Sequence, residues 1–596
     1  MVGTFQPTRR TIEPSVHASL KLSKKNLNDG LECIIPVTNK HTNAYLSISI
    51  MIGSANSPAS THQDSDTENA LRLSQLFDSA KSQSTQLVIN IQEIKQFIQK
   101  LQEKSRPVSS SGLPTFLRTL ERENKALSNI IKDVSNSNTI SDTHLLTLRE
   151  RKVNASVTIA NHSIAQWNQL KKTHGFIAIN QAFQGSSKDA RREEIQRHQI
   201  TGKDKHNMHR LLKEQGRVEV DVVHGGYEWI TSKAISRDRL ARQMNDSGWG
   251  WGDHELGDQV DRDEWGDTPL AKYVQRLVTA ARMNRHEYRF PKIRLILTSL
   301  GRGEKELDIL LHQLEHMDPL VEVIIEDQNS TFVTAAAPPL DIAIENLVGD
   351  ELASLTPTIN LDHTILIDLI SDLTHLNLKP QPWQSRTTRT QIDEENAHKG
   401  GLMARMLYPV LADRKLVCTR EAADHFHEVL QTVGTETERE RGRLLIPWSN
   451  DAQEMSSDLI RERFQELTVY TLPSNVQIPV TVIDEPWDME AITGAISQGT
   501  LPQVAHDVAL GSAFKSSKLS IFMYGWAAGL TTVTSNKEVR GQIRTWVETH
   551  RKHDEEIGPQ IWRLEVTRNL LAKAAQPREG WQEKDGADAD EGDAER

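Results

Sequence analysis

The stretch Ile359-Asn360-Leu361-Asp362-His363-Thr364 has the pattern of a short buried strand that ends on a carboxylate and leads directly into a helix. A second stretch, Leu530-Thr531-Thr532-Val533-Thr534-Ser535-Asn536, has the pattern of a later strand that ends on polar residues. In an open parallel sheet, polar groups at the carboxyl ends of the strands converge on one crevice. Asp362 is therefore the strongest candidate for a functional acid, and we expect Thr534 and Asn536 to end a neighbouring strand.

Size and composition indicate a soluble protein of several domains. The chain has 596 residues, which suggests two to four domains, and its formal net charge is -11. A field of that sign does not attract nucleic acid, so nucleic-acid binding would need a local basic patch. The two cysteines, Cys33 and Cys418, lie far apart in sequence, which suits a reducing compartment rather than a disulfide framework.

No membrane segment is expected. Residues 1–10 lack the hydrophobic core of a signal peptide, and the most apolar early run, residues 44–55, is shorter than the ~20 residues that a spanning helix needs. The sequence thus predicts a cytoplasmic or nuclear location, or both.

The hydrophobic pattern predicts an α/β fold class with a helical N-terminal domain, a central α/β segment and a C-terminal parallel-sheet domain. Apolar residues at helical spacing, such as Ile91, Ile94, Ile98 and Leu101, indicate the helices. Polar stretches without a period indicate disorder at both ends of the chain. The expected segments are a disordered extension at 1–65, a helical domain at 66–215, a central α/β segment at 216–340, a parallel-sheet domain at 345–575 and a disordered acidic tail at 576–596.

Two short patterns elsewhere resemble metal or nuclease sites. Residues 312–316 (His-Gln-Leu-Glu-His) match an inverted zinc-protease pattern, but the same helix is amphipathic, so an ordinary helix flank is the stronger interpretation. Asp221, Glu228 and Lys233 resemble the acid-acid-lysine set of restriction-type nucleases. That chemistry needs the lysine two residues after the second acid, where this chain has Ile230. We therefore expect no site there.

Several motifs in order along the chain resemble a eukaryotic family whose C-terminal half is called domain of unknown function 1308. They are Val220 to Gly226 with Trp229, Asn360 to Thr364 with Leu373-Thr374-His375, Phe426 to Leu430 with Thr432-Val433-Gly434, Glu438 to Arg441 with Leu445-Ile446, Leu519 to Phe522, and Thr534 to Asn536. The resemblance covers roughly residues 85–570. It implies a helical N-terminal domain and a C-terminal domain similar to PIN domains, the fold of many Mg²⁺- or Mn²⁺-dependent ribonucleases.

The resemblance implies a site with only part of the usual acidic set. Asp362 falls on the first PIN acid. In relatives the second acid immediately precedes a Phe, where this chain has His425, with Asp424 one step earlier and ~100° around a helix. The segment that carries the third acid, placed after a strand, corresponds to Met523-Tyr524-Gly525-Trp526, so Trp526 replaces that acid. The fourth position is Asn536 rather than Asp.

These departures predict a degenerate site. Mg²⁺ is held by oxygen ligands, and two-metal cleavage needs several carboxylates. Asp362 and Asp424 are the candidate catalytic pair, and Asp362 is at most a weak metal ligand. No cofactor is expected, except Mg²⁺ or Mn²⁺ if nuclease activity survives. The alternative for Asp362 is a structural helix N-cap.

The expected function is a degenerate PIN-like module that binds nucleic acid, with RNA as the candidate partner, or that acts as a scaffold. The candidate nucleic-acid contacts are Thr364, Thr534, Asn536, Lys537 and Arg540, although a solvated helix face is the alternative for the last two. A metal-dependent ribonuclease, and a protein-interaction protein that uses the helical domain, remain alternatives.

Overall fold

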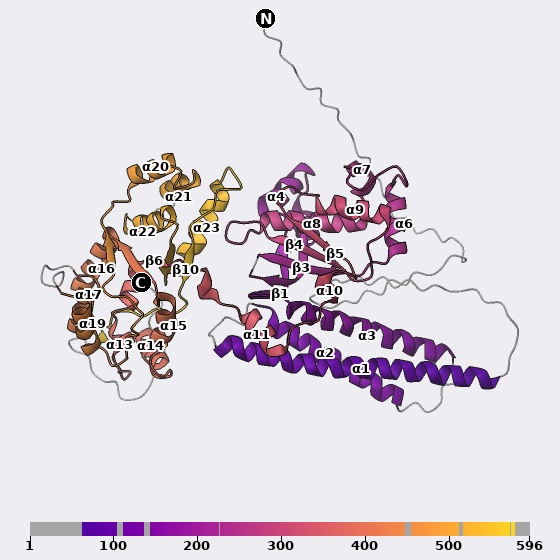
Figure 1. The fold of residues 1–596 in the computed structure, drawn as a ribbon, viewed down its shortest axis with the longest axis horizontal. Coiled ribbons are helices and arrows are strands. Elements are labelled where there is room, and N and C mark those ends of the chain that lie inside the picture. The colour runs from indigo at the N-terminus through magenta and orange to yellow at the C-terminus, as the bar shows by residue number, and fades with distance from the viewer. Residues whose placement is uncertain are drawn as a thin grey trace, which may run out of the picture. The chain divides into compact units, whose positions relative to one another are not determined.

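The computed structural model describes residues 62–103, 111–135, 143–225, 227–447, 455–511, 516–571 and 574–577 (Figure 1). The predicted disordered extension at 1–65 and tail at 576–596 lie almost wholly outside these residues. The first described helix, α1, begins at His62, inside the predicted extension.

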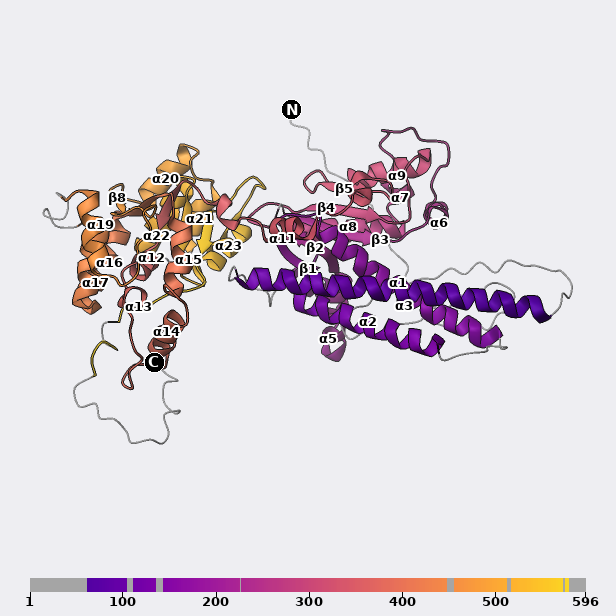
Figure 2. The same cartoon turned by 60° about the horizontal axis from the view of Figure 1, so that its bottom comes forward.

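Three long helices form one layer of the N-terminal part: α1 (His62–Glu103), α2 (Leu113–Ser135) and α3 (Thr143–Leu170). They lie alongside one another in both views (Figures 1 and 2). Their apolar stripes meet in a shared core that includes Leu87, Ile94, Phe97, Leu120 and Trp167. Each of these helices therefore buries the face that its helical spacing of apolar residues predicted.

A five-stranded mixed sheet forms the next layer, in the order β1-β2-β3-β4-β5. The pairs β1–β2 and β2–β3 are antiparallel, whereas β3–β4 and β4–β5 are parallel. The strands are β1 (Phe176–Gln184), β2 (Arg217–His224), β3 (Glu228–Lys233), β4 (Lys292–Leu297) and β5 (Val323–Glu326).

The first sheet is covered on both faces. Val222, Ile230 and Ile296 belong to the core that contains the three long helices. Ile293 and Leu295 face a second core, formed with the helices that follow β3 and β4. The other helices of this half are α4 (Lys188–Arg197), α5 (Gly202–Gln215), α6 (Arg237–Ser247), α7 (Arg262–Trp265), α8 (Pro269–Met283), α9 (Lys305–Glu315), α10 (Thr331–Thr334) and α11 (Leu340–Val348).

The prediction that residues 66–215 are entirely helical is wrong at β1. Residues 176–184 form the edge strand that pairs with β2, and the last long helix before them ends at Leu170. The pairing has a register shift between Phe176 and Ala178, and Asn180 has a positive φ of 53°. These irregularities break the alternation that would have marked a strand. The predicted boundary at 215/216 also runs through the core shared by helices and sheet.

A second five-stranded sheet, entirely parallel, forms the C-terminal part, in the order β10-β9-β6-β7-β8. The strands are β6 (Thr358–Leu361), β7 (Lys415–Thr419), β8 (Thr481–Ile483), β9 (Thr531–Thr534) and β10 (Ile561–Arg563). The chain fills β6, β7 and β8 in one direction and then places β9 and β10 on the other side of β6. The strand order therefore reverses between β6 and β9, which makes this pair the topological switch point.

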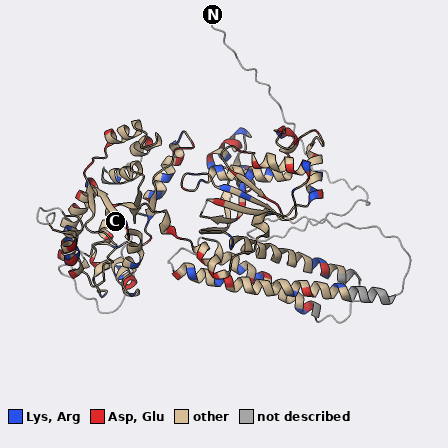
Figure 3. Ribbon diagram, viewed as in Figure 1, with Lys and Arg blue, Asp and Glu red and all other residues tan. Residues whose placement is uncertain are grey.

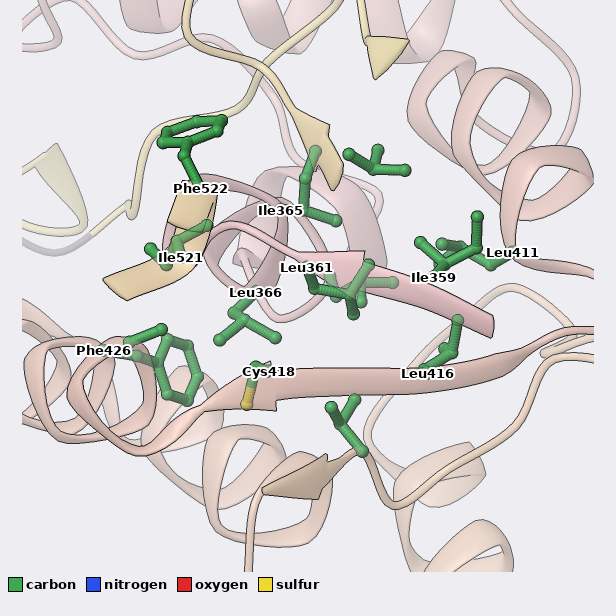
Figure 4. Close-up of a cluster of buried hydrophobic side chains, with 14 of the residues drawn as sticks. Ile359, Leu361, Ile365, Leu366, Leu411, Leu416, Cys418, Phe426, Ile521 and Phe522 are labelled. Carbon is green, nitrogen blue, oxygen red and sulfur yellow. The ribbon is translucent and has the colours of Figure 1, made fainter. Parts of the chain in front are cut away.

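Helices surround this sheet and complete one large core. Figure 4 shows part of it, where Ile359, Leu361 and Leu416 from the strands meet Phe426 and Phe522 from helices. The helices are α12 (His363–Asp368), α13 (Asp372–His375), α14 (Arg386–Asn396), α15 (Leu402–Leu411), α16 (Arg420–Val433), α17 (Glu436–Leu445), α19 (Ser457–Glu466), α20 (Met489–Ser497), α21 (Val504–Gly511), α22 (Ser516–Ala527) and α23 (Val539–His550), with a 3-10 turn, η1, at Glu351–Ser354.

The predicted fold class is confirmed: the chain is α/β, with a helical N-terminal region and two sheets. None of the helices in the described residues is long and apolar enough to cross a membrane.

Candidate functional site at the switch point

Asp362 lies where the sequence pattern placed it, directly after β6 and before α12. The neighbouring strand β9 ends at Thr534, and the two strands pair in parallel, with Leu361 opposite Val533. The backbone N–H of Asp362 donates to the carbonyl of Val533 at 3.0 Å. Asp362 and Thr534 thus stand side by side at the carboxyl edge of the sheet, on either side of the switch point.

The Asp362 carboxylate is held by donors from the protein itself. The hydroxyl of Thr364 donates to Oδ2 at 2.9 Å, and the hydroxyl of Thr534 donates to the same oxygen. His363 Nδ1 lies 2.7 Å from Oδ1, a close contact that is an ion pair only when the imidazole is protonated. Asp362 is only 1% exposed. Both of its oxygens therefore face neighbouring polar groups and not solvent.

These contacts also favour the charged form of Asp362. Burial by itself disfavours a carboxylate, but the contact with His363 and the two threonine hydroxyls outweigh it. The pKa of Asp362 therefore lies below its ordinary value. The group is an anion whose Oδ2 accepts two hydrogen bonds, whereas its buried Oδ1 accepts none.

The same contacts continue into the backbone of the β9–α23 connection. Thr364 Oγ1 accepts from the N–H of Ser535 at 3.2 Å, and Thr534 Oγ1 accepts from the N–H of Asn536 at 3.1 Å. The side chain of Asn536 then accepts from the N–H groups of Glu538 and Val539, where α23 begins. We call Asp362, Thr364 and Thr534 the switch-point clamp, because they tie the ends of β6 and β9 together.

The alternative role of Asp362 as a side-chain helix cap is wrong. Asp362 occupies the N-cap position of α12, but its side chain makes no cap hydrogen bond. The carboxylate points instead at the clamp hydroxyls. Asn536 is the residue whose side chain meets the first N–H groups of a helix.

Asp424, the predicted second catalytic acid, is exposed on α16, whereas Asp362 is buried. From the same helix, His425 lies beside His363, with ring centroids 5.0 Å apart and an interplanar angle of 73°. His425 Nδ1 also lies 3.5 Å from a carboxylate oxygen of Glu428. The imidazole of His425 thus stands at the position where the resemblance implies the second acid.

Trp526 does not stand in a segment after a strand. Residues 523–526 belong to α22, and the Trp526 indole N–H donates to the carbonyl of Ile557 at 2.9 Å. The uninterrupted apolar run of this segment suits a buried helix as well as a strand, and the helix is what forms. A tryptophan in this position contributes to the core, and its indole is directed at the backbone of residue 557.

Lys537 and Arg540 are exposed at the start of α23, close in sequence to the clamp. The Arg540 guanidinium lies 3.2 Å from a carboxylate oxygen of Glu287, and this negative charge partly neutralises the positive charge of Arg540. Arg544 is exposed one turn further along the same helix. Figure 3 shows basic residues on α23 and, over the two sheets, basic and acidic residues interspersed.

A buried polar cluster in the same half of the molecule was not predicted. Arg441 pairs with Asp372, and Arg568 pairs with Glu395, with all four side chains at most 4% exposed. Glu438 Oε1 accepts from the N–H of Leu571 at 2.7 Å. These groups hold the segment that follows β10. The Glu-Arg-Glu-Arg run at 438–441 is visible in the sequence, but the partners that Glu438 finds at Asp372 and Leu571, and Arg441 at Ile370, lie 66 or more residues away.

The two other patterns resolve into ordinary structure. His312 and His316 lie near each other on α9, with ring centroids 4.1 Å apart, and Glu315 is paired with Arg302. Asp221 accepts from the N–H of Ser232, whereas Glu228 pairs with Arg294. In the part of the chain that the structure describes, no group of three or more His, Cys, Asp or Glu residues could hold a metal ion.

Comparison with known proteins finds no match: no family model, no curated protein and no solved structure is similar to this chain. The function must therefore be argued from the site itself.

Proposed function

We propose that the C-terminal sheet is a degenerate PIN-like module that binds single-stranded RNA without cleaving it. The observation that carries the proposal is the engagement of the Asp362 carboxylate by Thr364, Thr534 and His363. We propose both the similarity to PIN domains and RNA as the partner.

The clamp argues against metal-dependent chemistry. A carboxylate oxygen has about two lone-pair sites, and Oδ2 of Asp362 already accepts from two hydroxyls. A divalent cation would have to displace those donors at Oδ2, or the close contact with His363 at Oδ1, in a site with 1% exposure. On α16, the imidazole of His425 lies beside His363, whereas Mg²⁺ prefers oxygen ligands. Two-metal phosphoryl cleavage has too few ligands here.

Binding without cleavage needs only positive charge and polar groups at the same edge. The exposed Lys537, Arg540 and Arg544 follow the clamp on α23 and supply a local basic stretch in an acidic protein. Each phosphate contact made by such a side chain adds affinity that falls with salt.

The test is fluorescence anisotropy of a labelled mixed-sequence single-stranded RNA with the full chain, in EDTA and in Mg²⁺. We expect the same affinity in both, and weaker binding for Lys537→Glu and Arg540→Glu. The slope of log K against log salt should become shallower by about 1 for each variant. The matched control is Lys399→Glu, an exposed lysine between α14 and α15, which should bind as the wild type does. No saturable binding, or equal losses in all three variants, refutes the proposal.

A further inference from the structure

Helices α4 and α5 border an open surface cavity of about 450 Å³, and five of its eight lining residues are Lys, Arg or His. Lys188 and Arg192 come from α4, and Lys205, His206 and His209 come from α5. No acidic side chain is among its lining residues. The cavity therefore has the charge that an anionic ligand requires.

The surrounding charges leave a positive excess. Residues 188–213 hold eight Lys and Arg against four Asp and Glu, in a chain of net charge -11. Asp189 lies 3.0 Å from Arg192 and neutralises part of that one group. The pKa of His209 lies below its ordinary value, through desolvation and then through the positive charges of Arg191, Lys188, Arg192 and His206. The charged groups around the cavity are thus mostly positive.

The start of α5 adds a second, independent feature. Thr201 stands at the N-cap position, but its side chain makes no cap hydrogen bond. The next residue, Gly202, lines the cavity with a φ of +64°, and a Cβ built there would meet nothing within 4 Å. The first N–H groups of this 14-residue helix thus border the cavity beside open space. Such helix ends favour anions.

We propose that the α4–α5 cavity binds a compact, soluble polyphosphate, held by Lys188, Arg192 and Lys205 and by the N–H groups at the start of α5. Several cations around one small space match a ligand with several charges on adjacent phosphates. The cavity lies within the usual range of small-molecule sites, about 300–1,000 Å³. Its lining holds no aromatic side chain other than the two histidines, so nothing there provides an extended ring to stack on a base. This inference is independent of the switch-point clamp.

The experiment is isothermal titration of the full chain with inorganic tripolyphosphate, with sulfate at equal ionic strength as the comparison anion. We expect one saturable site for tripolyphosphate and much weaker binding of sulfate. Lys188→Gln and Lys205→Gln should each weaken binding about tenfold, the loss of one charge-assisted contact. Lys203→Gln is the matched control, because Lys203 is exposed on α5 but does not line the cavity.

Three results would overturn the proposal. The first is the absence of saturable binding by a protein whose circular dichroism is that of a folded chain. The second is an equal loss of affinity in the control and the cavity variants. The third is binding of single-stranded RNA, or of vesicles with a phosphoinositide lipid, that displaces tripolyphosphate and is itself weakened by the cavity variants. That result would assign the cavity to a macromolecular or membrane surface instead.

Discussion

At the scale of single residues, the groups that surround Asp362 determine the role of its carboxylate. Two hydroxyls and an imidazole surround its carboxylate, and a group engaged in this way is a structural anion. Its low pKa means that it contributes stability at neutral pH, which is lost only as the pH falls through the acid range below its ordinary value.

Thr534→Val should test the clamp directly. Valine keeps the shape of threonine but can neither donate to Asp362 nor accept from the N–H of Asn536, so a charge-assisted hydrogen bond and a backbone hydrogen bond are lost. We expect the free energy of unfolding in urea to fall by about 1–3 kcal/mol. Thr549→Val is the control, because Thr549 is exposed on α23 and its hydroxyl donates only to the carbonyl of Thr545. Equal effects of both substitutions would show that the clamp contributes nothing.

The pKa of Asp368, the last residue of α12, is raised, whereas that of Asp362 is lowered. Burial outweighs its hydrogen bonds and raises its pKa to about 7, and its Oδ2 is buried without a partner. Between the ordinary pKa of an aspartate, about 4, and about 7, the folded state holds a proton that the unfolded state has released. Stability from this group therefore falls as the pH rises through that window.

Asp368→Asn should remove that pH dependence, since asparagine resembles the protonated acid. We expect the variant to gain stability relative to the wild type by about 2 kcal/mol more at pH 8 than at pH 5. The measurement is urea unfolding of both proteins at the two pH values. A difference between variant and wild type that does not change with pH would show that Asp368 is ionised throughout.

At the scale of elements, local pattern predicted some parts well and others not at all. The strand-carboxylate-helix sequence at 359–364 is a local signal, so β6 and α12 were found. Strand β1 was missed because its register shift and the positive φ of Asn180 disrupt its alternation, and because pairing with β2 defines it. Residues 523–526 were placed after a strand by the family resemblance, whereas they belong to helix α22, and their short apolar run does not distinguish a strand from a helix.

The clamp itself could not be predicted for a related reason. Thr534 is 172 residues from Asp362, and the local sequence of neither segment predicts the hydrogen bond between the two side chains. What the sequence does supply is the placement of polar residues at two strand ends. Only the strand order makes those ends neighbours.

Helix α22 packs so closely on the sheet that glycine is required at one position. A Cβ at Gly525 would lie 2.1 Å from Thr532 Oγ1 and 3.0 Å from Asn360 Nδ2. We expect Gly525→Ala to destabilise the protein by about 1–3 kcal/mol in urea unfolding. Gly541→Ala in α23 is the matched control, because a Cβ there meets nothing within 4 Å. That variant should gain up to about 1 kcal/mol from helix propensity. A change in unfolding free energy of the same sign for both variants would contradict the close packing at Gly525.

At the scale of the whole molecule, charge and topology set the limits of function. The chain is acidic overall, with a net charge of -11, and small groups of basic residues lie around the start of α23 and around the α4–α5 cavity. The second sheet presents its switch point in the arrangement of many ligand-binding α/β folds. The residues at that point have hydroxyls and imidazoles in place of a set of metal-binding carboxylates.

We propose that the switch-point clamp ties the ends of β6 and β9 together and that this site does not catalyse metal-dependent cleavage of RNA. The most direct test is incubation of labelled single-stranded RNA with the full chain in Mn²⁺ or EDTA, beside the variant Asp362→Asn. We predict no cleavage by either protein in Mn²⁺, and a lower unfolding free energy for the variant. Cleavage by the wild type in Mn²⁺ that is absent in EDTA and absent in Asp362→Asn would contradict the account and establish a nuclease.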